Sequence, residues 1–120
     1  GYYGVGALRH GFLRTSDGTI TTFDAPAAIR GTFPSSINPK GAITGTYTDA
    51  NGNHGFLRTR SGTITTFDAP GAVGATYPVS INPEGAITGY YIDANGGYQG
   101  FLRTQACDRN DHERECDGDK

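Results

Sequence analysis

The sequence of 120 residues has no methionine, no tryptophan and only two cysteines. It contains no apolar run near the roughly 20 residues that a membrane-spanning helix needs. Hydrophobic residues make up 35% of the chain, which limits the size of a packed core. The net charge of -2 provides no basic field for a phosphate backbone or an anionic lipid surface. We therefore expect no nucleic-acid partner and no membrane span.

Glycine and threonine are abundant instead, with 19 glycines in the chain. Threonine is β-branched and favours pleated strands, whereas glycine disfavours the interior of a helix. The composition therefore predicts an all-β protein of short strands and tight turns.

The chain repeats itself with a period of 44 residues, because residues 45–88 match residues 1–44 in register. A partial third copy covers residues 89–104. The motif GFLRT begins at Gly11, Gly55 and Gly100, and the motif GTITTFDAP begins at Gly18 and Gly62. Residues that recur at a fixed offset are more often framework than chemistry.

The period predicts two domains, a tandem β-repeat domain at residues 1–104 and an acidic tail at residues 105–120. Gly1 matches Gly89, which lies in the middle of the motif. We therefore expect a truncated or processed parent with more repeats upstream.

The second copy predicts four antiparallel strands joined by turns, at residues 41–49, 54–59, 63–67 and 76–81. The first of these alternates with a period of two. The residues expected on its buried face are Ile43, Gly45 and Tyr47, and those expected on its wet face are Thr44, Thr46 and Thr48. The wet threonines are candidates for O-linked sugars.

Four short strands in about 44 residues is the dimension of one β-propeller blade. A closed propeller typically needs 4 to 8 blades, and this chain contains about two and a half. Its sheet edges therefore need a longer parent, ring closure by several chains, or open stacking into a fibre.

The motifs HGFLRT, TITTFDAPGA, SINPEGAITGYY and DANG resemble the repeats of bacterial extracellular proteins of the HAF family. The resemblance covers residues 1–104. It implies an exported, propeller-like repeat protein, located outside the cell or on its surface. The chain departs from the family in its low repeat number, in Gln99 at the position of His10 and His54, and in its cysteine-containing tail.

Charged residues recur with the same period. Arginine recurs at Arg14, Arg58 and Arg103, and aspartate at Asp24 and Asp68. Opposite charges on neighbouring strands are an ordinary way to fix register, so we predict arginine–aspartate pairs across strands or repeats. A ring of ligand-binding charges is the alternative.

The histidines His10 and His54 are candidate acid–base groups, but neither has an evident partner in the nearby sequence. No nucleophile elbow, HExxH motif, phosphate-binding loop or paired carboxylates occur. The sequence therefore predicts a protein that is not an enzyme.

The turn at residues 49–53 offers three oxygen-bearing side chains at alternate positions, as calcium loops do. The candidate ligands are Asp49, Asn51 and Asn53, with Asp93 and Asn95 in the third copy. A hairpin turn explains these residues without metal, so no cofactor is expected and calcium is the alternative.

Tyrosines could form a carbohydrate site between repeats, because an aromatic face can stack on a sugar ring. The candidates are Tyr47, Tyr91 and Tyr98. The alternative interpretation places Tyr47 and Tyr91 in the core of a chain that has no tryptophan.

In the tail, an exported protein would most simply join Cys107 and Cys116 by a disulfide. The alternatives are metal binding by these cysteines with His112, or collection of calcium by the tail carboxylates.

We expect a non-enzymatic extracellular structural protein whose partner is itself, assembling through exposed sheet edges into an oligomer or fibre. The alternative is a lectin-like module that binds glycans between blades.

Overall fold

The computed structural model describes residues 1–5, 8–26 and 30–104, which form ten β-strands and no helix. The predicted all-β fold is confirmed. The strands are β1 (Tyr2–Val5), β2 (Leu8–Arg14), β3 (Ile20–Phe23), β4 (Gly31–Ile37), β5 (Ile43–Asp49), β6 (Gly52–Arg58), β7 (Ile64–Phe67), β8 (Thr76–Ile81), β9 (Ile87–Ile92) and β10 (Tyr98–Arg103). Within the described residues, no helix is long and apolar enough to cross a bilayer.

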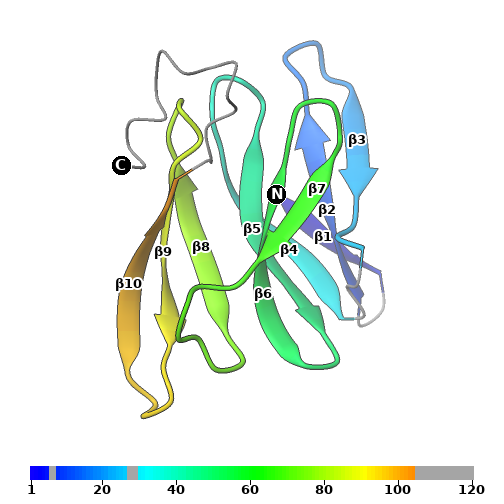
Figure 1. Ribbon diagram of the computed structural model, residues 1–120. Coiled ribbons are helices and arrows are strands. Elements are labelled where there is room, and N and C mark those ends of the chain that lie inside the picture. Colours follow the sequence, from blue (N-terminus) through cyan, green and yellow to red (C-terminus); the bar gives the residue numbers. More distant parts are fainter. Residues whose placement is uncertain (6–7, 27–29, 105–120) are drawn as a thin grey trace.

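The strands form three antiparallel units that lie side by side (Figure 1). The first unit is β1–β2–β3, the second unit is β4–β5–β6–β7, and the third unit is β8–β9–β10. The second unit contains three of the four strands that the second copy predicts, as β5, β6 and β7. The fourth, predicted at residues 76–81, is β8 with the same bounds, and it begins the third unit.

One parallel bridge links each unit to the next. Arg9 of β2 pairs with Gly31 of β4, and 44 residues later Asn53 of β6 pairs with Ala75, just before β8. The period of the sequence is therefore also a period of the structure.

Two glycines of the repeat are required by a close backbone approach. The first strand of the second and third units carries a bulge, between Pro34 and Ser36 in β4 and between Pro78 and Ser80 in β8. A Cβ atom on Gly45 would lie 2.2 Å from the Phe33 carbonyl oxygen, and one on Gly89 would lie 2.2 Å from that of Tyr77. A side chain at either position would displace the bulged strand.

The two faces of β5 are both covered, which corrects one prediction. Ile43, Gly45 and Tyr47 are buried as expected. Thr44, which was expected on a wet face, is 0% exposed and donates a hydrogen bond of 2.8 Å to the Phe56 carbonyl oxygen. The prediction failed because the next unit packs on that face, so Thr44 is also inaccessible to O-linked sugars.

The apolar core lies between units and not within them. One cluster joins Leu13, Phe23 and Ala25 of the first unit and its following loop to Ile43, Tyr47, Phe56 and Ile64 of the second. The other joins Ala42, Leu57 and Phe67 of the second unit to Ile81, Ile87 and Phe101 of the third. Because the second unit presents both faces to neighbours, burial between units is the main apolar stabilisation of the fold.

Candidate functional site

A phenylalanine on the last strand of one unit contacts an arginine and a phenylalanine of the next. The Phe23 ring meets the Phe56 ring edge to face, with centroids 6.0 Å apart. The Arg58 guanidinium lies over the same ring, 5.0 Å from its centroid. Edge-to-face rings and a cation over an aromatic face are both favourable arrangements. We call this arrangement the phenylalanine joint.

The joint recurs 44 residues later. Phe67 meets the Phe101 ring at 6.2 Å, and the Arg103 guanidinium lies 4.7 Å from the Phe67 centroid. Burial lowers the pKa of Arg103, and its Nη1 atom is buried with no hydrogen-bond partner among the described residues. The aromatic ring of the preceding unit is therefore the principal contact of this cation.

The phenylalanine ring also rests on a glycine of its own unit. A Cβ atom added to Gly11 would lie 2.9 Å from the Phe23 ring, and one added to Gly55 would lie 2.7 Å from the Phe67 ring. The glycine of the GFLRT motif therefore provides the space for the ring on the adjacent strand.

The predicted arginine–aspartate pairs are wrong for the second and third units. Arg58 and Arg103 contact aromatic rings, and the aspartates instead accept hydrogen bonds from histidines. The Nδ1 atom of His10 lies 2.9 Å from Asp24, and that of His54 lies 2.6 Å from Asp68. The two residues of each pair are fourteen positions apart, so the sequence alone did not indicate this contact.

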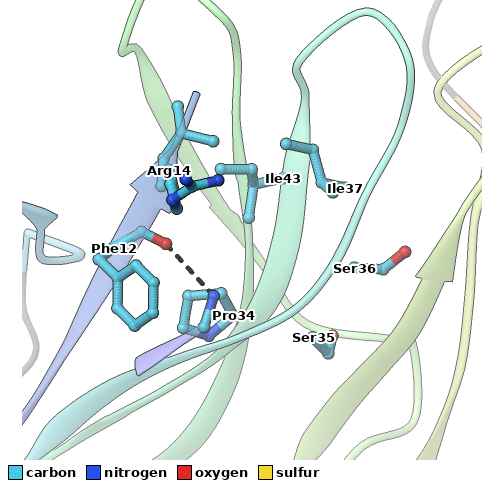
Figure 2. A pocket seen from close by; sticks show the side chains of 9 residues that line it. Phe12, Arg14, Pro34, Ser35, Ser36, Ile37 and Ile43 are labelled. Atoms are coloured by element: carbon cyan, nitrogen blue, oxygen red, sulfur yellow. Dashed lines mark hydrogen bonds between the residues drawn. The ribbon is translucent and has the colours of Figure 1, made fainter. Parts of the chain in front are cut away.

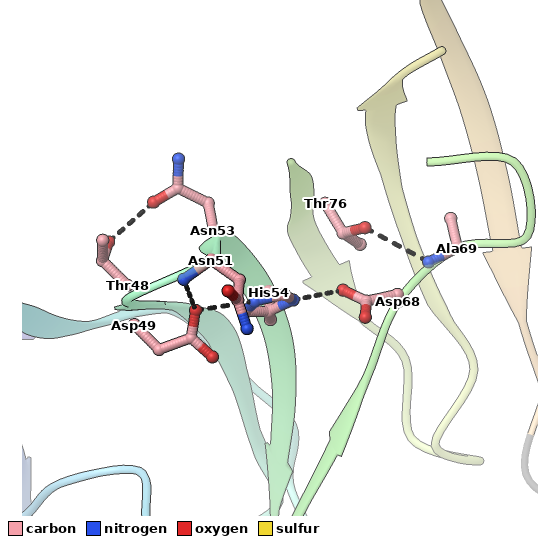
Figure 3. Close-up of polar contacts among 8 residues, drawn as sticks. All are labelled: Thr48, Asp49, Asn51, Asn53, His54, Asp68, Ala69 and Thr76. Atoms are coloured by element: carbon pink, nitrogen blue, oxygen red, sulfur yellow. Dashed lines mark hydrogen bonds and ion pairs between the residues drawn. The ribbon is translucent and has the colours of Figure 1, made fainter. Parts of the chain in front are cut away.

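His54 joins two carboxylates, and we call the group of Asp49, His54 and Asp68 the His54 clasp (Figure 3). Its Nε2 atom lies 2.9 Å from Asp49 and its Nδ1 atom 2.6 Å from Asp68. Burial lowers the pKa of His54, but the hydrogen bonds and negative charges of the two aspartates outweigh it and raise that pKa. With both ring nitrogens in use, His54 has no nitrogen left to act as a base.

The clasp is reduced in the other two units. His10 contacts a single carboxylate, because Val5 stands where Asp49 stands in the second unit. In the third unit Gln99 donates a hydrogen bond of 3.0 Å to Asp93. The clasp ties the β5–β6 hairpin to the end of β7, and its variation between units indicates a structural contact.

The two aspartates among the candidate calcium ligands accept hydrogen bonds from their own turns. Asp49 accepts a hydrogen bond from the Asn51 amide, and Asp93 accepts hydrogen bonds from the amides of Asn95 and Gly97. Asn53 accepts a hydrogen bond from Thr48 and donates one of 3.1 Å to the Tyr77 hydroxyl. In the part of the chain that the structure describes, no group of three or more His, Cys, Asp or Glu residues is placed to hold a metal ion.

The structure separates the three candidate tyrosines. Tyr47 is only 6% exposed and lies in the apolar cluster between the first and second units, so no sugar can stack on it. Tyr91 is half-buried, whereas Tyr98 is 71% exposed. Tyr90 was missed: its ring, 39% exposed, is nearly parallel to that of Tyr98, with centroids 5.7 Å apart.

The outer face of the third unit has no cover among the described residues. Tyr98, Gly100 and Leu102 alternate along β10 on the face that carries Tyr90, and all four are exposed. Leu102 is 65% exposed, whereas Leu57 at the same motif position is 7% exposed. This surface, which we call the trailing face, is therefore a packing face without a neighbour in the described part of the chain.

The opposite end of the molecule is also uncovered by any of the described residues. The leading face of the first unit carries Tyr3, Phe12, Arg14 and Ile20, and Ile20 is 58% exposed. Beside it, Phe12, Arg14, Ile37 and Ile43 line a groove of about 360 Å³ (Figure 2). In the second unit Arg58 pairs with Ile43 on one side and Ile64 on the other, whereas among the described residues the strand partner of Arg14 is Ile20 of β3.

The remaining predicted site, the pair of Cys107 and Cys116, lies outside the described residues. The sequence matches no known family model and no curated protein, and the fold matches no solved structure. The geometry of the three units is therefore the basis for assigning a function.

Proposed function

We propose that this chain is a non-enzymatic, extracellular structural repeat protein of the HAF type. Its blade-like units assemble into an oligomer or fibre through the open ends of the array. One observation carries the proposal: the leucine of the GFLRT motif is 7% exposed at Leu57, where a further unit is present, and 65% exposed at Leu102, where none is described. Burial of an exposed aliphatic side chain is favourable, so the exposure of Leu102 favours association with a further unit.

Each open end presents a part of the interface that joins the internal units, although among the described residues the trailing face lacks an equivalent of β3 or β7 and the leading face lacks one of β4 or β8. The leading face presents Phe12 and Arg14, the equivalents of Phe56 and Arg58. The trailing face presents Leu102 and two tyrosine rings, over which a guanidinium can lie as Arg58 lies over Phe23. An assembly that grows by contact between two different faces need not close on itself, so this contact can build an open fibre as well as a ring.

The histidines support the structural interpretation. His54 uses both ring nitrogens in contacts with carboxylates, and its counterpart in the third unit is Gln99. A catalytic base needs a free nitrogen within reach of substrate.

The test is to measure mass by light scattering across protein concentration and to image the same samples by negative-stain electron microscopy. We expect concentration-dependent oligomers or fibres. Leu102→Lys blocks the trailing face and Ile20→Lys the leading face, so each should prevent growth. Val73→Lys is the matched control, because Val73 is 59% exposed but lies in the loop before β8.

Mixing the two blocked variants distinguishes the geometry of the contact. Each variant retains one intact face, and the two intact faces differ, so the mixture should form dimers that grow no further. A wild-type chain that stays monomeric at high concentration would contradict the proposal.

A lectin-like activity is the second candidate, and the exposed stack of Tyr90 and Tyr98 favours it. A glycan array would test it, with Tyr98→Ala expected to abolish binding and Tyr2→Ala as the control, since Tyr2 is also exposed but lies in β1. Binding that survives Tyr98→Ala would rule out this surface as the sugar site.

A further inference from the structure

The outer edge of β10 differs from the same edge in the other two units. In the first unit, residues Gly11–Arg14 pair with β3, and in the second unit residues Gly55–Arg58 pair with β7. Residues Gly100–Arg103 repeat the GFLR sequence but pair only with β9 among the described residues. The backbone of this edge is a template for one more antiparallel strand.

The edge also has room for an aromatic ring. In the first two units the phenylalanine that pairs with the motif glycine lies close to the place of a Cβ atom, at 2.9 Å over Gly11 and 2.7 Å over Gly55. At Gly100 the nearest described atom to that place is the Gly89 carbonyl oxygen, 3.8 Å away. Exposed Tyr90, Tyr98 and Leu102 surround this space on the same face.

The sequence after β10 does not repeat the motif that forms β3 and β7. The GTITTFDAP motif comes after the GFLRT motif in the first two repeats and does not recur after Thr104. Residues 105–120 contain no isoleucine, valine, leucine, phenylalanine or tyrosine. They therefore lack the β-branched and aromatic side chains of β3 and β7.

We propose that the outer edge of β10 is a strand-acceptor site, and that its ligand is an extended Ile-Thr-Thr-Phe segment of another repeat polypeptide. The added strand runs antiparallel to β10, with its isoleucine opposite Arg103 and its phenylalanine opposite Gly100, as Ile64 and Phe67 lie opposite Arg58 and Gly55. Backbone hydrogen bonds provide affinity, and the ring on Gly100 provides specificity.

This inference rests on the proposed function, since it names the partner chemistry of one open edge. It is tested separately, because a short peptide can bind β10 whether or not the whole chain assembles. Peptide binding without assembly would support the acceptor site and overturn the proposed function, and assembly without peptide binding would do the reverse.

The experiment titrates the full chain with a synthetic peptide of the chain's own residues 62–70 and monitors backbone amide resonances by NMR. We expect saturable shifts concentrated at Gly100–Arg103. The peptide with alanine in place of Phe67 should bind about tenfold more weakly or worse, since it loses a buried ring.

The matched protein variant is Gly100→Val, which fills the ring space without meeting a described atom closer than 3.8 Å from its Cβ. It should fold and lose peptide binding, whereas Gly97→Ala, in the hairpin turn, should bind as the wild type does. Absence of shifts at millimolar peptide, shifts centred on β2, or binding unchanged by Gly100→Val would each overturn the inference.

Discussion

The second and third units contain nearly the same strands but have different surroundings. Thr44 is fully buried and Thr88 is exposed; Leu57 is buried and Leu102 is exposed. By contrast Ile87, which faces the second unit, is as buried as its equivalent Ile43. A side chain of the repeat is therefore buried by the neighbouring unit and not by its own strand, as in other arrays whose stability comes from nearest-neighbour interfaces.

The largest effect expected from this comparison is at the phenylalanine of the GFLRT motif. Phe56 is 0% exposed and contacts Phe23 of the preceding unit, so we expect Phe56→Ala to lower the free energy of unfolding by about 3–5 kcal/mol. Phe12 has the same motif position but is only half-buried. Phe12→Ala should therefore lower the free energy of unfolding by less than about half as much as Phe56→Ala. Denaturant midpoints of the two variants measure the difference.

Equal losses of unfolding free energy in Phe56→Ala and Phe12→Ala would mean that the leading face of the first unit is already covered by a neighbour in solution. Repeating the measurement at several protein concentrations separates cover by another copy, which dilution removes, from cover within one chain.

A smaller effect is expected at the threonine of the GAITG motif. Thr44→Val keeps the shape of the side chain but removes the hydrogen bond to the Phe56 carbonyl. It should therefore lower the free energy of unfolding by about 1 kcal/mol. Thr88→Val removes an exposed hydroxyl and should change stability by less than about 0.5 kcal/mol. Thermal or urea unfolding of both variants tests this, and a comparable loss at Thr88 would contradict the open trailing face.

Much of the fold could be predicted because the repeat carries its own local signals. The alternation before Asp49, the Asn-Gly turn and the proline after Asp68 place β5, β6 and β7 within two residues of their observed bounds. The sequence does not show which face a neighbour covers. That is why the face of Thr44 was expected to be wet.

The contacts between units were the part that sequence reasoning missed. The opposite charges of Arg58 and Asp68 suggested an ion pair, but the Arg58 guanidinium lies over the ring of Phe23, which is distant in the sequence. Tyr90 was overlooked because its equivalent in the second repeat is Thr46. The one local signal available was the five-residue separation of Asp49 and His54 across a predicted hairpin, which brings them within hydrogen-bond distance.

The smallest predicted effect is a pH dependence that distinguishes the second unit from the other two. A neutral imidazole has one N–H, so two carboxylate contacts favour the charged form of His54. Its pKa in the folded state is raised above the ordinary value of 6.5, and the stability that it contributes is present below that value and lost as the pH rises through the raised pKa. Burial raises the pKa of Asp49, but the Asn51 amide and His54 lower it overall, so its contribution is lost as the pH falls through a value below 3.8.

His54→Gln places at position 54 the residue that the third unit has at Gln99. The free energy of unfolding of this variant should fall less between about pH 6 and pH 9 than that of the wild type, because the ordinary histidine pKa is about 6.5. We expect a total change below about 1 kcal/mol, as for ion pairs that solvent screens. His10→Gln is the matched control, because His10 contacts one carboxylate and not two. Urea midpoints at each pH measure both variants, and an unchanged slope in His54→Gln would show that folding does not raise the pKa of His54.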